Sequence, residues 1–137
     1  MGTKLLFTLI CDDVREEKSG KLTLVGLYNY KISFAAPVIS VASLDPSAKF
    51  VLPQMCIMRR WTRDAAGTQS VTQIVNERGG LVASLPPITL APVPDEGYCQ
   101  EIIRLLGLPL ERGLHTIRTT SSGMTYEELF LVTVQHG

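Results

Sequence analysis

The sequence carries no net charge and few charged residues. Its 13 Lys and Arg balance 13 Asp and Glu, and charged residues make up only 19% of the 137 residues. Proteins that bind nucleic acids or membrane surfaces through a whole-molecule field need an excess of positive charge. We therefore expect no membrane partner, and the composition disfavours a nucleic-acid partner unless a local patch supplies the charge.

Long hydrophobic runs are absent as well. No segment approaches the length of about 20 apolar residues that spans a bilayer. The run from Leu5 to Ile10, before Cys11, is too short for the core of an export signal, and bulky Ile10 stands where signal cleavage requires a small residue. These absences predict a cytoplasmic protein, with residues 4–11 forming a buried strand.

Cysteine is scarce and odd in number. Cys11, Cys56 and Cys99 cannot all pair within one chain, whereas small secreted domains usually carry an even set of disulfides. The three also lack the Cys-x-x-Cys spacing of zinc and redox sites. We expect reduced, buried and unreactive thiols in a reducing compartment.

Few residues could support histidine-based catalysis, because His115 and His136 are the only histidines. His115 shares its strand parity with Ile117 and Thr119, which predicts a hydrogen-bonded histidine facing the interior. No nucleophile elbow, zinc-binding His-Glu-x-x-His pair or phosphate loop is present. We expect no catalytic residue and no cofactor. An enzyme with a site assembled from distant loops stays an alternative, which a cleft containing His115 beside a carboxylate would support.

The residues that are present predict one all-β domain over 1–137. Hydrophobic residues make up 45% of the chain, enough for a single core at this length. Apolar runs or period-two alternation predict the main strands, with turn residues between them. These strands lie near 4–11, 21–33, 54–63, 68–77, 114–120 and 125–134.

The remaining segments are predicted from glycine and proline. Residues 81–85 pair with 68–77 across Gly79-Gly80, and four prolines make 86–97 an edge or a loop. Residues 98–108 fit a helix or a strand, and Pro109 favours the strand. The chain crosses between sheets over 35–53, with a short strand at 38–41. Together these elements indicate an antiparallel two-sheet β-sandwich, immunoglobulin-like in outline.

Three patterns, spread over nearly the whole chain, resemble a family of small bacterial β-sandwich proteins of uncharacterised function. They are the acidic turn leading into residues 20–28, the strand 55–61 followed by its glycine hairpin, and residues 108–117 with the terminal strand. The resemblance implies the fold and no catalytic residues. The family is expected to carry an aromatic residue, often Tyr, at the position of His115, so this chain departs from it there.

Acidic residues gather between the first two predicted strands. Asp12, Asp13, Glu16 and Glu17 offer the oxygen ligands that Ca²⁺ or Mg²⁺ prefers. Basic residues stand among them, and no Asp-x-Asp-x-Asp-Gly loop is present. We interpret the cluster as a solvated hairpin tip and predict no metal site.

The segment 59–63 is the strongest candidate for a binding site. In an extended chain Arg59, Trp61 and Arg63 share one face, and Trp and Arg are enriched at interface hot spots. They could also stack on bases or simply cap the core. The leading hypothesis is a non-catalytic binding or assembly module that uses sheet edges, loops or this face to hold a protein partner, or a copy of itself. A nucleic-acid binder through the same residues is the second hypothesis.

Overall fold

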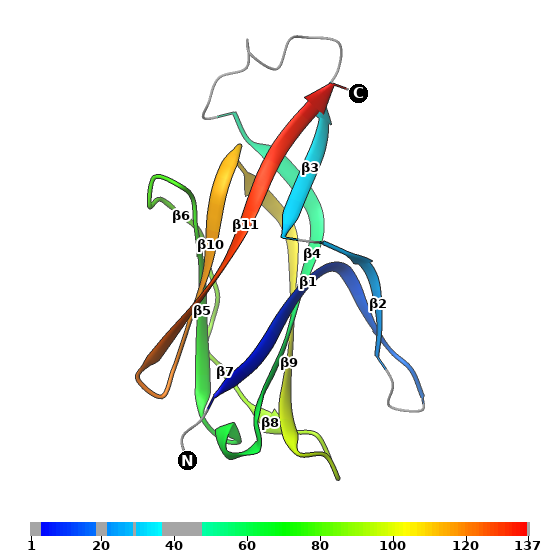
Figure 1. The fold of residues 1–137 in the computed structure, drawn as a ribbon, viewed down its shortest axis with the longest axis vertical. Helices are drawn as coiled ribbons and strands as arrows, with labels where there is room; N and C mark the ends of the chain where they lie inside the picture. The colour runs from blue at the N-terminus through cyan, green and yellow to red at the C-terminus, as the bar shows by residue number, and fades with distance from the viewer. Residues whose placement is uncertain (1–3, 19–21, 29, 37–47, 137) are drawn as a thin grey trace.

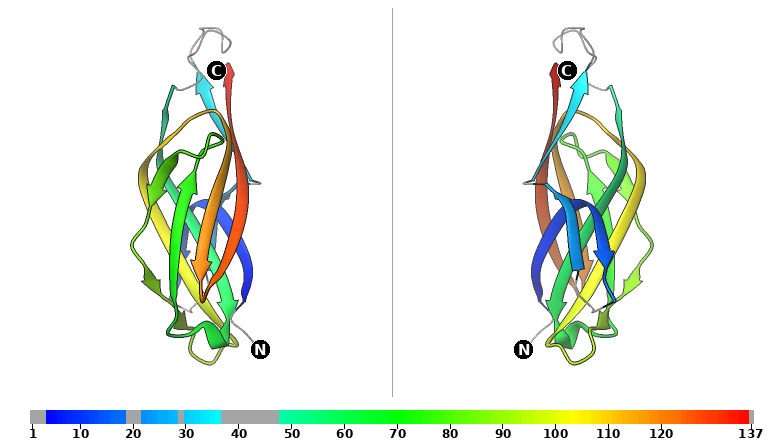
Figure 2. Two further views of the ribbon diagram at one scale, coloured as in Figure 1. Left: turned by 90° about the vertical axis from the view of Figure 1, so that its left-hand side faces the viewer. Right: turned by 90° about the vertical axis from the view of Figure 1, so that its right-hand side faces the viewer.

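Two packed β-sheets form the molecule, which confirms the predicted β-sandwich (Figure 1). The computed structural model describes residues 4–18, 22–28, 30–36 and 48–136. The first sheet has the strand order β2-β1-β4-β9-β8, and the second has the order β3-β11-β10-β5-β6. Figure 2 views the outer side of the second sheet on its left and that of the first sheet on its right.

The first sheet is antiparallel throughout. Its strands are β1 (Leu5–Glu16), β2 (Leu22–Leu27), β4 (Phe50–Thr62), β8 (Ala91–Pro92) and β9 (Tyr98–Leu110). The ambiguous segment 98–108 is therefore a strand, as predicted. Pro109 disfavours a helical backbone at the residue before it, and β9 pairs with β4 along nearly its whole length.

The second sheet is mixed, because β3 runs parallel to β11 while its other pairs are antiparallel. Its strands are β3 (Lys31–Ala36), β5 (Gln69–Val75), β6 (Leu81–Ser84), β10 (Gly113–Ser121) and β11 (Met124–His136), and the two-residue β7 (Ile88–Thr89) pairs with β5. The predicted hairpins over 68–85 and 114–134 are confirmed. Ser122 and Gly123 both have positive φ, 52° and 76°, as a two-residue hairpin turn of type I′ requires.

The single strand predicted over 21–33 is wrong. The chain leaves the first sheet after Leu27 and enters the second at Lys31. Tyr30, which lies between β2 and β3, has a positive φ of 55° that interrupts the extended backbone, and Gly26 near the end of β2 has a positive φ of 66°. The Tyr30 hydroxyl donates a hydrogen bond to the Thr8 carbonyl oxygen, 3.0 Å away, which holds the corner against β1.

The prediction that the acidic residues form a turn is also wrong, because Asp12, Asp13 and Glu16 belong to β1, which continues to Glu16. Of the prolines of 86–97, only Pro92 lies in a strand, the two-residue β8, and the others lie in loops, which agrees with the predicted edge or loop. The predicted short strand at 38–41 lies outside the described residues.

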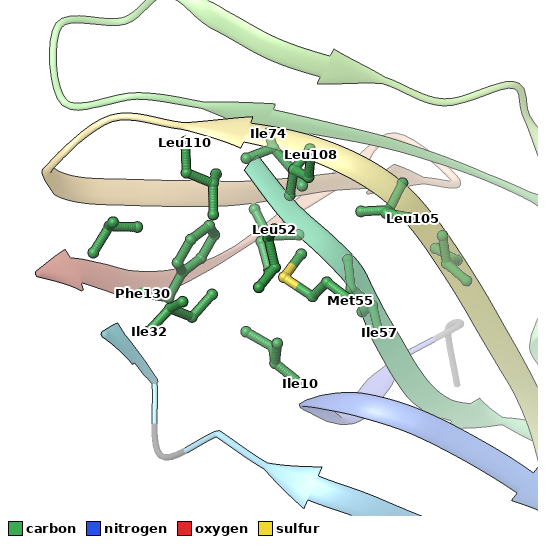
Figure 3. Close-up of a cluster of buried hydrophobic side chains, with 13 residues drawn as sticks. Ile10, Ile32, Leu52, Met55, Ile57, Ile74, Leu105, Leu108, Leu110 and Phe130 are labelled. Carbon is green, nitrogen blue, oxygen red and sulfur yellow. The ribbon is translucent and has the colours of Figure 1, made fainter. Parts of the chain in front are cut away.

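The main core lies between the sheets. Figure 3 shows Leu52 and Met55 of β4 pointing toward Phe130 of β11 across the interior. Alternate residues of each strand face inward, as Ile57, Ile103 and Ile117 do, because successive side chains of a strand point to opposite faces. A separate small cluster lies on the outer side of the first sheet, and a third closes the end near Trp61.

Gly26 provides a test of the corner between the sheets. It lies opposite Asp12 in the β1–β2 pair, and a Cβ atom there would overlap the Asp12 carboxylate. Gly26→Ala combines this overlap with a strained positive φ, so we expect a loss of about 1–3 kcal/mol in the free energy of unfolding, measured by urea denaturation. Gly97→Ala is the control, because a Cβ there meets nothing within 4 Å. Equal losses in the two variants would contradict this account of the corner.

Candidate functional site

The segment 59–63 lies inside the protein along most of its length. Arg59 and Trp61 are fully buried, and Arg63 lies exposed in the 3-10 turn Arg63–Ala65 that follows β4. The expectation that these three side chains form one partner-facing surface is therefore wrong. The reason is parity: Arg59 and Trp61 continue the inward-facing series of Met55 and Ile57.

Glu101 of β9 receives the polar groups of this segment. Arg59 lies directly opposite Glu101 in the β4–β9 pair, and its Nη1 atom is 3.1 Å from Glu101 Oε1. The Trp61 indole N–H donates to the same oxygen at 3.2 Å. Ser70 of β5 donates its hydroxyl hydrogen to Glu101 Oε2. One buried carboxylate thus accepts hydrogen bonds from both sheets.

Arg59 also reaches the second sheet directly. Its Nη1 donates to Thr72 Oγ1 at 2.9 Å, while Nε and Nη2 have no hydrogen-bond partner among the described residues. Burial lowers the pKa of Arg59, and the nearby carboxylates of Glu101 and Glu128 oppose that shift. Arginine stays protonated in proteins, so the pair is a buried ion pair. Its arrangement joins the sheets and offers no opening to a ligand.

Trp61 and Arg63 close one end of the sandwich. Trp61 packs with Ala65, Leu90 and Cys99, and its ring meets Tyr126 edge-on with centroids 5.5 Å apart. The Arg63 guanidinium donates to the Glu96 carbonyl oxygen. Trp61 therefore packs in the core, while Arg63 ties down a surface loop.

His115 is a core residue, as its parity predicted. It is fully buried, its Nδ1 atom lies 3.1 Å from the Gly113 carbonyl oxygen, and its ring stacks on Phe130 with centroids 5.0 Å apart. Burial lowers the pKa of His115, and the hydrogen bond to Gly113 and the carboxylates of Glu111 and Glu77 oppose that shift more weakly. The imidazole therefore packs in the core against Phe130, as an aromatic side chain would.

A small charged pocket lies near His115, between the β5–β6 and β9–β10 loops. Its volume is about 110 Å³, and Glu77, Arg78, Glu111 and Arg112 line it. Arg78 Nη2 lies 2.7 and 2.6 Å from the two Glu111 oxygens, so this carboxylate is already engaged. The residues that line the pocket do not include His115. This pocket is therefore not the cleft with His115 beside a carboxylate that would support an enzymatic site.

The outer side of the second sheet carries an exposed apolar surface that the sequence reasoning missed. We call it the leucine face, formed by Leu81 of β6, Leu114 of β10, and Leu129 and Leu131 of β11. Their side chains are 60%, 38%, 49% and 39% exposed. Leu114 lies directly opposite Leu131. Thr116 lies opposite both Leu129 and Val75, and Val75 lies opposite Leu81, so the surface is continuous from β11 to β6.

A signal for this face exists in the sequence. β11 reads Leu129, Phe130, Leu131, Val132, so it is apolar on both sides, whereas a solvated antiparallel strand alternates apolar with polar residues. Phe130 and Val132 form the inward side of β11, and Leu129 and Leu131 form its outward side.

Other classes of site find no support in the described part of the chain. No group of three or more His, Cys, Asp or Glu side chains there is placed to hold a metal ion. No helix there is long and apolar enough to cross a membrane. No protein-family model matches the sequence, and a search of curated proteins found no significant match.

The role of the buried ion pair of Arg59 and Glu101 can be tested by substitution. Glu101→Gln leaves the Arg59 cation buried without a counter-charge, so we expect the free energy of unfolding to fall by about 3–5 kcal/mol. Adding Arg59→Met removes that stranded charge, so the double variant is more stable than Glu101→Gln alone. Denaturant unfolding of the single and double variants measures both effects.

An exposed ion pair supplies the control. Arg118 and Glu127 lie 3.7 Å apart on the outer side of the second sheet. Glu127→Gln is expected to change stability by at most about 1 kcal/mol, as exposed pairs do. Similar losses for Glu101→Gln and Glu127→Gln would contradict the structural role of the buried pair.

His115 predicts a pH dependence. The pKa of His115 is lowered in the folded state and is about 6.5 in the unfolded state. Below about pH 6.5 the unfolded chain therefore binds a proton at His115 more readily than the folded chain does. Stability is therefore lost as the pH falls below about 6.5. His115→Phe keeps the stacking on Phe130 and removes this loss. Urea denaturation at several pH values checks it, and an equal pH dependence in both proteins would refute it.

Proposed function

We propose that this domain is a non-catalytic binding or assembly module that associates through the leucine face, and that its partner is a second copy of the same chain. The observation that carries the proposal is the grouping of four exposed leucines on one side of one sheet, on β6, β10 and β11. Contiguous exposed apolar surface on a folded protein usually marks an interaction site, whereas single exposed leucines do not.

The surroundings of the leucine face support a second copy as the partner. Lys31 of β3 lies beside Leu131, and the pair Arg118–Glu127 lies in the next outward-facing row along β10 and β11. Both signs of charge therefore border the apolar surface. The protein has no net charge, so two copies approach without overall repulsion. Packing the two faces together would bury the leucines and leave the charged rim in water.

The proposal places the domain in the bacterial β-sandwich family whose patterns it resembles, and in the cytoplasm. Three buried thiols that the structure leaves unpaired, Cys11, Cys56 and Cys99, agree with a reducing compartment. The two rival functions have less support. Of Arg59, Trp61 and Arg63 only Arg63 is exposed, and the residues that line the charged pocket do not include His115.

Leu129→Lys tests the proposal. A lysine in the middle of the leucine face puts a charge into the buried part of the interface, so we expect the dimer to dissociate. Leu129 is half-exposed, so the melting temperature should stay close to that of the wild type. Sedimentation equilibrium over about 1–100 µM protein measures the association, a range that covers common dissociation constants.

Leu106→Lys is the matched control, because Leu106 is 75% exposed on β9 of the other sheet. It should dimerise as the wild type does. A wild-type protein that stays monomeric over the whole range would reject self-association. A dimer that survives Leu129→Lys would place the interface elsewhere. Capture of a different protein by the wild type and not by Leu129→Lys would replace the second copy with that partner.

A further inference from the structure

Two of the three cysteines face each other across neighbouring strands. Cys11 of β1 and Cys56 of β4 are directly opposite in the antiparallel pair, so their side chains lie on the same side of the first sheet. Both are fully buried, and they belong to the small apolar cluster outside the main core. Both thiols also approach Asp13, with Cys11 Sγ 3.4 Å from its carbonyl oxygen and Cys56 Sγ 4.0 Å from Oδ1.

The thiols are covered by an arm of the chain rather than by the opposite sheet. The β1–β2 arm consists of residues 12–16 and 22–27, which pair with each other after β1 has left β4 at Cys11. It lies at the outer side of the first sheet (Figure 2, right). Val14, Leu22 and Leu24 of the arm pack on the two cysteines and their neighbours.

Polar contacts fasten the arm to the sheet. Arg104 of β9 donates from Nη2 to the Val14 carbonyl oxygen at 2.8 Å, and its Nε lies 4.0 Å from Asp13 Oδ1. Gln54 of β4 donates to the Asp12 carbonyl oxygen at 3.0 Å and to Asp13 Oδ1 at 3.1 Å. Arg104 is half-exposed, so these contacts form a fastening at the surface over buried thiols.

The spacing of the pair suits a disulfide. Directly opposite residues of an antiparallel pair have Cα atoms about 4.5–5.5 Å apart, which lies within the range of about 4.4–6.8 Å that disulfides span. Cβ atoms about 4.5–5.5 Å apart need to approach by only about 1 Å. We infer that Cys11 and Cys56 form an oxidation site, a protected dithiol that a small disulfide oxidant such as glutathione disulfide converts to an intrachain disulfide when the β1–β2 arm opens.

The chemistry balances as two thiol–disulfide exchanges. One cysteine thiolate attacks a sulfur of glutathione disulfide, which forms a mixed disulfide and releases one glutathione thiolate. The second cysteine thiolate attacks the protein sulfur of that mixed disulfide and releases the other glutathione thiolate. The protein loses two electrons and two protons, and glutathione disulfide is reduced to two glutathione molecules.

Access to the pair controls the reaction. Burial, and then the neighbouring Cys56, raise the pKa of Cys11 to about 11, so the closed site holds little thiolate. Opening of the arm exposes the thiols to water and to the oxidant, and the free energy of this local opening sets the rate. Cys99 has no such neighbour, since it lies opposite Trp61 in the cluster at the end of the sandwich.

The experiment treats the folded wild-type protein with excess glutathione disulfide, blocks remaining thiols with an alkylating agent and maps the peptides without reduction. We expect one linkage, Cys11 to Cys56, with Cys99 alkylated, and full reversal by dithiothreitol. Cys99→Ser should form the same linkage. Cys56→Ser should stop at the mixed disulfide with glutathione on Cys11.

Arg104→Met tests the role of the arm. Removing the charged hydrogen bond to Val14 should make the disulfide form about tenfold faster. Arg118→Met, the same substitution on the other sheet, should leave the rate unchanged. A linkage to Cys99, or no linkage in folded protein that oxidises readily when denatured, would overturn the dithiol site. Equal rates for Arg104→Met and the wild type would overturn the control by the arm.

Discussion

The buried pair of Arg59 and Glu101 constrains the sandwich more than any single apolar contact. Its carboxylate accepts from Arg59, Trp61 and Ser70, which belong to two strands of different sheets. A buried ion pair adds little net stability over an apolar core, because desolvation offsets the attraction between the charges. A wrong register, by contrast, is costly, since a slip of one residue would turn the arginine outward and leave the glutamate without its counter-charge. The pair therefore selects the register of β4 and β9 and the way the sheets face each other.

This constraint also explains where the protein is available for interaction. Arg59 and Trp61, which suggested a binding surface, are buried inside the sandwich, where they hold the sheets together. The outer surface offers other features: a sheet side with exposed leucines and an arm that covers two thiols. The proposed association and the proposed oxidation site lie on opposite sides of the sandwich, so one can change without the other.

Much of the fold could be predicted from local patterns, and what could not depends on distant pairings. The turn at Ser122-Gly123 and the alternation of Phe130 and Val132 are local, and they predicted the terminal hairpin correctly. The break at Tyr30 was missed, because alternation of apolar residues does not report a positive φ. The buried fate of Arg59 depends on Glu101, 42 residues away, although the parity of Met55 and Ile57 already pointed inward. The leucine face was missed for a similar reason, since it forms only when four strands are placed side by side.

The parallel pairing of β3 with β11 has a consequence for how the chain reaches this structure. Ser33 and Thr133, whose hydroxyl groups lie 2.8 Å apart, are 100 residues apart in sequence. In the described part of the chain, β11 is the only strand that pairs with β3. During synthesis the segment that becomes β3 leaves the ribosome long before its partner exists, and pairings so distant in sequence form slowly. Until residues 131–136 are made, Ile32 and Phe34 are without the strand that pairs with them, and unpaired apolar segments of this kind are prone to aggregation during folding.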